Sequence, residues 1–127
     1  MGRRSTRETG DIAEKHARRV MKQHGYRILE TNYWGAGAEV DIVASKDDSI
    51  VFAEVKSGST DEFGSPREWV GRAKQRKLTR AAVVFLKSRR LSNTSWRFDV
   101  VEVIFGPDGE VASAEIIENA FEPRGIF

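Results

Sequence analysis

Three carboxylates and one lysine recur at two-residue spacing within two short, largely apolar stretches. Glu39 and Asp41 lie in the first stretch, and Glu54 and Lys56 lie in the second. Side chains alternate along a strand, so each pair is expected on one strand face, and a hairpin would bring all four charges to one side. Like charges at such a distance repel each other. A divalent cation such as Mg²⁺, which prefers oxygen ligands, would remove the repulsion.

The chemistry of such a group is hydrolysis at phosphorus. A magnesium ion held by carboxylates orients water, lowers its pKa and stabilises charge on a phosphoryl oxygen. Lys56 would position or deprotonate the attacking water, or neutralise charge on the phosphate. The spacing alone also fits a solvent-facing sheet surface on which the same side chains form cross-strand salt bridges. From the residue pattern by itself, both interpretations stay open.

The elements that must position these residues follow from hydrophobic periodicity and turn signals. A helix over 9–23 and a helix over 65–88 are expected, with strands over 26–33, 38–45, 50–56, 96–105 and 110–117. Residues 119–127 form a tail with room for one helical turn. The order α-β-β-β-α-β-β predicts an α/β protein with one mixed central sheet flanked by helices.

Local signals fix the expected helix starts and strand faces. Thr9 is the expected N-cap of the first helix, and Ser65 begins a capping box for the second. In the strand over 38–45, Val40, Ile42 and Ala44 should share one face. In the strand over 50–56, Phe52, Glu54 and Lys56 should point one way, with Val51, Ala53 and Val55 pointing the other.

Charge is concentrated in one segment. The chain has a net charge of only +2, yet residues 66–97 carry ten basic side chains and one acidic one. A basic helix face of this kind could track a DNA backbone, although the same run also fits an ordinary solvated helix face. The residues expected to contact nucleic acid are Arg72, Lys74, Arg76, Lys77 and Arg80.

Length and composition bound the class of protein. The 127 residues suit one domain, expected over 9–127 after a flexible basic arm at 1–8. The chain has no cysteine, which excludes disulfides and thiolate metal sites. No apolar run reaches the roughly 20 residues that span a bilayer, and no signal peptide is evident. We therefore expect a cytoplasmic protein without membrane contacts.

A series of motifs along nearly the whole chain resembles the YraN family of small bacterial proteins. They are Thr9-Gly10-Asp11, Glu14, Ala17, Gly25-Tyr26, Asn32, Glu39 to Val43, Val51 to Lys56, Lys74, Arg97 to Val101 and Ala120-Phe121. The arrangement of Asp, Glu-x-Lys and flanking helices also resembles the PD-(D/E)XK nuclease superfamily. The resemblance implies a restriction-endonuclease-like fold, similar to that of archaeal Holliday junction resolvases.

The resemblance also implies roles for individual residues. Asp41 and Glu54 would bind Mg²⁺ or Mn²⁺, with the backbone carbonyl of Val55 and with Glu14 as further ligands. Lys56 would be the catalytic lysine. In addition, Glu39 would support these ligands or hold a second ion. The implied activity is a metal-dependent endonuclease acting on DNA, with branched or structured DNA among the substrates. Because junction-cleaving relatives act as dimers, a homodimer is left open.

The sequence departs from the family pattern around the predicted site. Val40 replaces a proline, Ala38 replaces a glycine, Gly58 stands where arginine is frequent, and Trp34 stands where a basic residue is usual. The acidic set is intact, but the lost basic side chains put phosphate contacts in doubt. A non-catalytic nucleic-acid-binding or adaptor domain on the same fold is therefore the alternative, and a protein-interaction module is a third interpretation. Trp34, Trp69 and Phe63 could be interface anchors or core residues.

Overall fold

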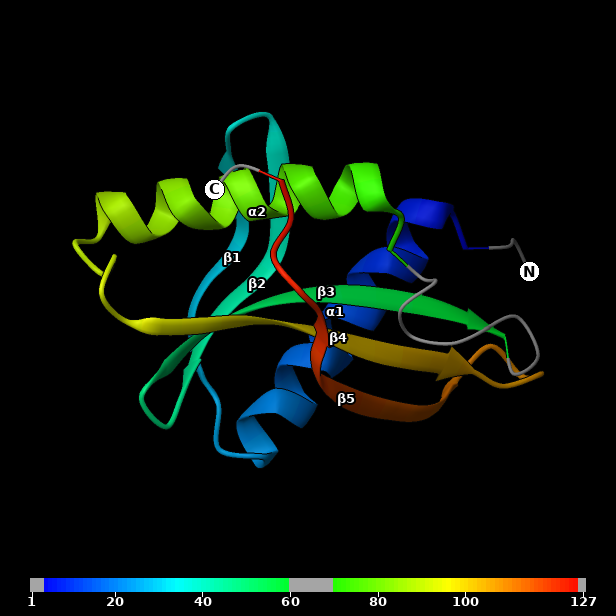
Figure 1. Ribbon diagram of the computed structural model, residues 1–127. Helices are drawn as coiled ribbons and strands as arrows, with labels where there is room; N and C mark the ends of the chain where they lie inside the picture. The colour runs from blue at the N-terminus through cyan, green and yellow to red at the C-terminus, as the bar shows by residue number, and fades with distance from the viewer. Residues whose placement is uncertain (1–3, 60–69, 126–127) are drawn as a thin grey trace.

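A computed structural model describes residues 4–59 and 70–125 and confirms the predicted α/β class and element order (Figure 1). Its elements are α1 (Thr6–Gln23), β1 (Arg27–Gly35), β2 (Ala38–Lys46), β3 (Ser49–Ser59), α2 (Arg72–Ser88), β4 (Ser95–Phe105) and β5 (Val111–Phe121). Among these residues, no helix is long and apolar enough to cross a membrane.

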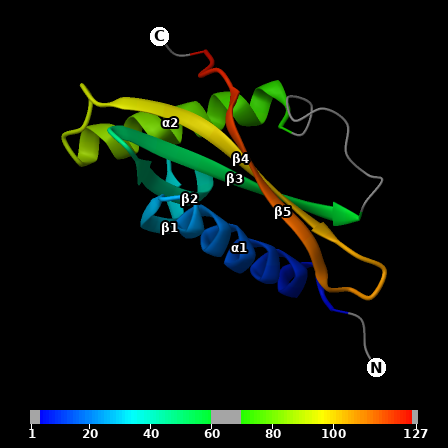
Figure 2. The same ribbon diagram turned by 90° about the horizontal axis from the view of Figure 1, so that it is seen from below.

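The five strands form one mixed sheet in the order β1-β2-β3-β4-β5. Neighbouring strands are antiparallel except β3 and β4, which run parallel from Ser49 opposite Ser95 to Ser59 opposite Phe105. A parallel pair requires a long crossover connection, and the segment that contains α2 provides it. The two helices lie on opposite faces of the sheet (Figure 2).

Each helix covers its own hydrophobic cluster. The cluster under α2 includes Phe52, Phe85 and Phe98, whereas the cluster under α1 includes Ala13, Ala17, Met21, Val51 and Ala53. Alternation along β3 therefore sends Phe52 toward α2 and its neighbours Val51 and Ala53 toward α1. This confirms the predicted sorting of side chains on β3, and it assigns Glu54 to the α2 side.

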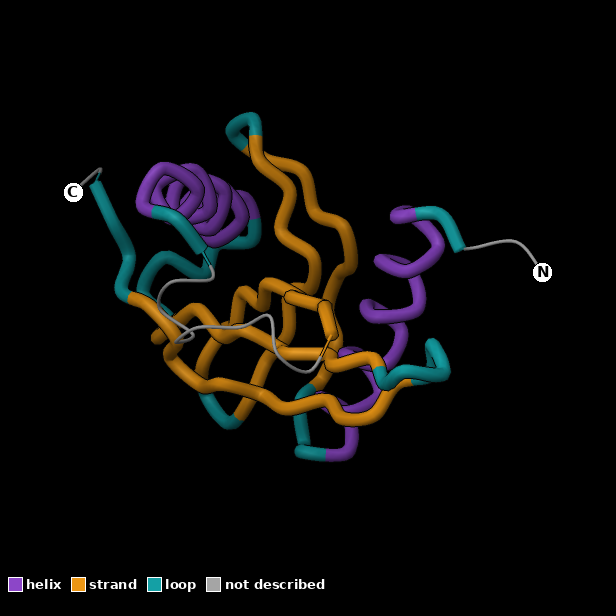
Figure 3. The backbone as a smooth tube through the Cα atoms, turned by 90° about the vertical axis from the view of Figure 1, so that its right-hand side faces the viewer, coloured by secondary structure: helices purple, strands orange, loops and turns teal. Residues whose placement is uncertain are grey.

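The β1–β2 hairpin separates from the rest of the sheet. β2 pairs with β3 only between Ile42 and Lys46, but it continues to pair with β1 as far as Ala38. Figure 3 shows the hairpin rising between the two helices. We call the point beyond Ile42, where β2 leaves β3, the fork.

The fork corrects one prediction about strand faces. Val40 packs in the cluster under α2, whereas Ile42 and Ala44 pack in the cluster under α1. The three residues were predicted to share a face because strict alternation was assumed. A free two-stranded ribbon twists more strongly than strands held within a larger sheet, so the hairpin turns its face once it has left β3.

The helix boundaries also differ from the predictions. α1 begins at Thr6 because Ser5, not Thr9, is the N-cap, and its side chain accepts a hydrogen bond from the Glu8 amide at 3.1 Å. α2 begins only at Arg72, since the N-cap Gly71 has extended backbone angles. The predicted capping box at Ser65, and the aromatic residues Phe63 and Trp69, lie outside the described residues.

The C-terminal strand is longer than predicted, because β5 continues to Phe121. Its end is held by Asp99 on β4, which is fully buried. The carboxylate of Asp99 accepts hydrogen bonds from the Asn119 amide at 2.9 Å, the Tyr26 hydroxyl at 2.7 Å and Arg97 Nε at 2.9 Å. The Arg97–Asp99 pair is thus structural, and it ties β4 to β5 and to the start of β1.

Candidate functional site

Glu54 is the most buried acidic residue near the fork, with 6% of its surface exposed. Its Oε1 accepts a hydrogen bond from Lys74 Nζ of α2 at 2.7 Å, which also forms an ion pair. Its Oε2 is buried and has no hydrogen-bond partner among the described residues. Buried polar atoms in folded proteins nearly always have a partner. One oxygen of Glu54 is therefore placed to receive a donor or a cation.

Asp41 occupies the fork itself. Since β2 has left β3 at this level, the Val55 amide has no strand partner on β2, and Oδ2 of Asp41 accepts its hydrogen bond at 2.8 Å. A buried amide must be paired, so the carboxylate completes the ladder in place of a backbone carbonyl. The role of Asp41 in the fold is thus to close the gap between the two strands.

The electrostatic environment of Asp41 disfavours its charge. Burial, followed by the nearby Glu54 carboxylate, raises the pKa of Asp41 from 3.8 to about 7, against the opposing effect of the Val55 hydrogen bond. Glu14 also raises this pKa, and Lys74 lowers it. Carboxylates that share a poorly solvated space repel when ionised. A bound cation would relieve this repulsion.

Glu14 and Glu39 are linked by Asn32, a residue to which the sequence pattern gave no role in the site. Asn32 Nδ2 donates hydrogen bonds to Glu14 Oε1 at 3.1 Å and to Glu39 Oε1 at 2.7 Å. Asn32 has a positive φ of 51° within β1, a conformation that asparagine tolerates better than most residues. Burial is the main reason that the pKa of Glu14 is raised. A helix carboxylate and a hairpin carboxylate are thereby held side by side.

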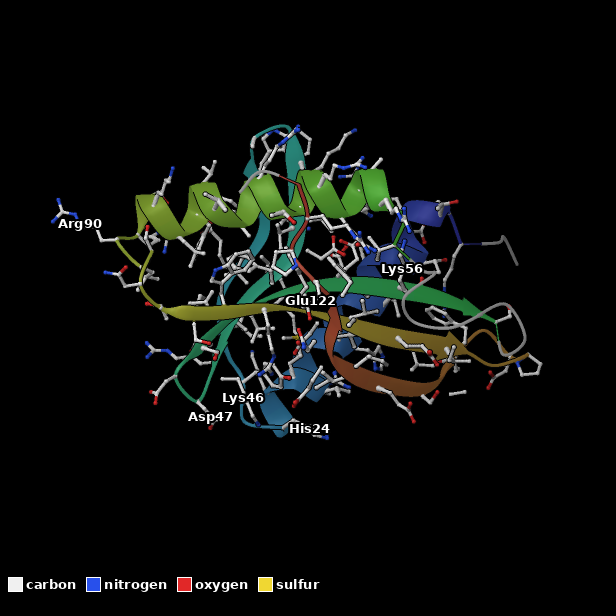
Figure 4. All side chains as sticks on the ribbon, in the orientation of Figure 1. His24, Lys46, Asp47, Lys56, Arg90 and Glu122 are labelled. Atoms are coloured by element: carbon white, nitrogen blue, oxygen red, sulfur yellow. The ribbon has the colours of Figure 1, made fainter. Side chains whose placement is uncertain are left out.

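Lys56 follows Glu54 by two residues on β3 and is half-buried. In Figure 4 it lies on the side of β3 toward α2, consistent with the alternation that directs Glu54 that way. The predicted catalytic lysine thus shares a strand face with the buried carboxylate.

A cleft of about 490 Å³ opens between the hairpin and α2. It contains Asp41 and Glu54, together with Glu39 from the hairpin and two predicted DNA-contacting lysines from α2. The full set of lining residues is Trp34, Gly37, Ala38, Glu39, Asp41, Glu54, Ala73, Lys74, Lys77 and Leu78. The structure therefore brings together carboxylates and ammonium groups that are far apart in the sequence.

The remaining predicted basic residues lie elsewhere on α2. Arg72, Arg76 and Arg80 are exposed but do not line the cleft. The Arg76 side chain lies beside Gly125, where an added Cβ would come within 3.1 Å of its aliphatic carbons. Arg76 is thus in part a contact for the C-terminal segment.

The carboxylates are not arranged as a complete metal site. Within residues 4–59 and 70–125, no three acidic or histidine side chains lie close enough together to hold an ion. Lys74 neutralises one oxygen of Glu54, and Asn32 engages Glu14 and Glu39. The structure therefore brings the predicted metal ligands near one another but does not direct all of them at one point.

Comparison with known proteins places the chain in a family. The model of "Uncharacterised protein family UPF0102" matches residues 13–103. A UPF0102 protein of Moorella thermoacetica is 44% identical over 115 residues, covering 91% of this chain and 96% of the relative. The chain belongs to the UPF0102 family. The UPF0102 match confirms the predicted YraN-like family membership.

Further UPF0102 proteins match over nearly their whole length. The protein of Syntrophus aciditrophicus is 41% identical over 114 residues, which cover 90% of this chain and 88% of the relative. That of Clostridium acetobutylicum is 40% identical over 119 residues, covering 94% and 98% respectively. The matched segment of the family model includes the fork, the cleft and α2, so the candidate site lies within the family's common region.

Proposed function

We propose that this UPF0102 protein is a divalent-metal-dependent endonuclease that hydrolyses phosphodiester bonds in DNA. The observation that carries the proposal is the meeting of Asp41 and Glu54 in an open cleft beside lysine ammonium groups. One carboxylate oxygen there is buried without a partner among the described residues, and the neighbouring aspartate resists ionisation.

By donor type, the residues present suit a hard divalent cation, although among the described residues no three carboxylates are gathered around one point. Oxygen ligands suit Mg²⁺ and Mn²⁺, and Oε2 of Glu54 is a buried acceptor that no described residue uses. Asp41 and Glu54 would hold the ion, with Glu14 and the Val55 carbonyl as the further proposed ligands. When bound, a divalent ion supplies positive charge for a phosphoryl oxygen and lowers the pKa of a coordinated water.

The lysines would supply the positive charges that the proposed reaction needs at the phosphate. Lys56 would orient the attacking water or neutralise charge that develops on the phosphate, since it lies on the same β3 face as Glu54. Lys74 and Lys77 line the cleft that contains Asp41 and Glu54 and would hold the DNA backbone. The basic surface would be extended along α2 by Arg72, Arg76 and Arg80. Sequence-independent phosphate contacts of this kind make binding sensitive to salt.

Cleavage assays test the proposal directly. Labelled linear, nicked and branched DNA would be incubated with the protein in Mg²⁺, Mn²⁺ or EDTA. We expect cleavage that requires metal and that falls at least about 100-fold in Asp41→Ala and Lys56→Ala, in line with loss of a group that stabilises the transition state. Lys87→Ala, at the distant end of α2, is the matched control. Absence of cleavage on every substrate, or equal cleavage by the variants, would overturn the endonuclease assignment.

A non-catalytic DNA-binding domain is the second candidate, and the Lys74–Glu54 ion pair favours it, because an ammonium group already occupies one carboxylate oxygen. Calorimetric titration with Mn²⁺ separates the two. The endonuclease predicts binding that is abolished in Glu54→Gln. The binding-only domain predicts no metal uptake, together with DNA binding that weakens as salt rises.

A further inference from the structure

Trp34 presents the most exposed large apolar side chain in the described part of the protein. Its exposed fraction is 67%, compared with 41% for Val84 and 37% for Leu29. It is also the one of these three that lines the cleft containing Asp41 and Glu54. The fold therefore leaves an indole ring open to solvent at the edge of the candidate site.

The hairpin holds Trp34 in a defined place. The preceding residue, Tyr33, packs edge-on against Phe85 of α2, with ring centroids 5.2 Å apart. The following residue, Gly35, lies so close to the Tyr33 ring that an added Cβ would come within 2.9 Å of it. Across the hairpin, Trp34 pairs with Glu39, so both residues lie on the same hairpin face. The anchored Tyr33 thus fixes the backbone that carries the indole.

The cleft presents an aromatic face and ammonium groups together. Trp34 offers a flat apolar surface, and Lys74 and Lys77 line the cleft with it. A nucleotide combines a flat base with an anionic phosphate, so its two parts match these two features. Stacking of a base on an aromatic side chain strengthens binding to any base, because every base has a flat π-face. Within a continuous duplex, both faces of each base are already covered by neighbouring bases.

We propose that Trp34 stacks on an unpaired base of the DNA bound in this cleft, so that the preferred substrates contain unpaired nucleotides next to the cleaved bond. This inference rests on the proposed function for the identity of the bound polymer. Its chemistry is separate from catalysis, because stacking requires neither the metal nor Lys56.

Binding measurements in EDTA test the inference without any cleavage. Fluorescence anisotropy would give Kd values for a short single strand, a duplex with an unpaired flap, a blunt duplex and a single strand made of abasic sites. Trp34→Ala is expected to weaken binding of the single strand and the flap about 5- to 100-fold, as the loss of one stacked base predicts. Blunt-duplex and abasic-strand affinities should stay within about twofold of wild type, because neither offers a free base to the indole.

Matched variants separate stacking from a structural role. Trp34→Phe should recover most of the affinity for unpaired DNA, and Val84→Ala, which removes an exposed apolar side chain outside the cleft, should leave every Kd unchanged. The inference would be overturned if Trp34→Ala weakened binding equally on all four DNAs or on none of them. It would also be overturned if wild type bound the abasic strand as tightly as the single strand with bases. An unpaired RNA strand bound more tightly than the DNA strand would also overturn it. Failure of cleavage with base-dependent binding intact would refute only the endonuclease assignment.

Discussion

Replacing Asp41 with asparagine should stabilise the protein in EDTA near pH 8 and leave its stability almost unchanged near pH 4. The asparagine amide keeps an oxygen that can accept the Val55 amide hydrogen bond, so the backbone contact at the fork survives the change. What the substitution removes is a negative charge that burial and Glu54 make unfavourable. The experiment thus isolates the electrostatic part of the role of Asp41.

The magnitude follows from the pKa. A rise from 3.8 to about 7 corresponds to roughly 4 kcal/mol between the two protonation states, at about 1.4 kcal/mol for each factor of ten. Burial is the first cause of this shift and the Glu54 carboxylate the second. Because relaxation and water penetration reduce the cost of a buried charge, we expect about half of this energy, ~2 kcal/mol, from removing the charge.

The sign of the pH dependence is fixed by the direction of the shift. Because the pKa of Asp41 is higher in the folded state than its ordinary value of 3.8, the folded protein binds the extra proton between these two values. The stabilising contribution is therefore complete below about pH 4 and is lost as the pH rises to about 7. Above that, wild type carries the buried charge and the asparagine variant does not.

Urea unfolding in EDTA, followed by circular dichroism from near pH 4 to near pH 8, measures this difference. The gap between Asp41→Asn and wild type should grow with pH, whereas Asp48→Asn in the exposed β2–β3 turn should show no such trend. A variant that is destabilised near pH 8, or that differs from wild type equally at every pH, would refute the electrostatic reasoning.

Three further predictions concern the fold, each checked by urea unfolding near pH 7. Phe52→Ala should lower the free energy of unfolding by about 3–5 kcal/mol, because the ring is 1% exposed at the centre of the α2 cluster; a loss below about 1 kcal/mol would contradict this. Tyr26→Phe should cost about 1–3 kcal/mol, since buried Asp99 loses its 2.7 Å hydroxyl donor; an unchanged midpoint would show that the bond is not needed. Gly25→Ala should cost about 1–2 kcal/mol because φ is +87° there, while Gly10→Ala, in open space within α1, is the control and should not destabilise.

Much of the fold could be predicted from local sequence signals. The alternation of Phe52 and Glu54 with Val51 and Ala53 sorted β3 correctly, because β3 has neighbours on both sides along much of its length. Alternation failed on β2, where Val40 and Ile42 belong to different clusters. No local pattern in the sequence indicates where one strand stops pairing with its neighbour, so the fork could not be predicted.

The sequence predicted which residues belong to the candidate site better than it predicted the contacts between them. The position of Glu54 on the α2 face followed from strand period. Its ion pair with Lys74 joins residues that are 20 positions apart in the sequence. The crossover between β3 and β4 brings them together, and hydrophobic periodicity does not determine how that crossover packs. The bridging role of Asn32 likewise depends on how α1 and the hairpin meet in space. Long-range contacts of this kind come from tertiary packing, which a single sequence does not encode in any local pattern.

The fork affects which substitutions and length changes the sequence can accept. The part of the hairpin beyond Ile42 has no ladder pairing with β3, whereas Asp41 stays fixed by its bond to the Val55 amide. Substitutions or altered lengths at the hairpin tip, where Trp34 lies, would therefore leave the register of the central strands untouched. The tip of the hairpin can therefore vary while Asp41 and Glu54 keep their places. Ligand selectivity could thus change without altering the position of these two carboxylates.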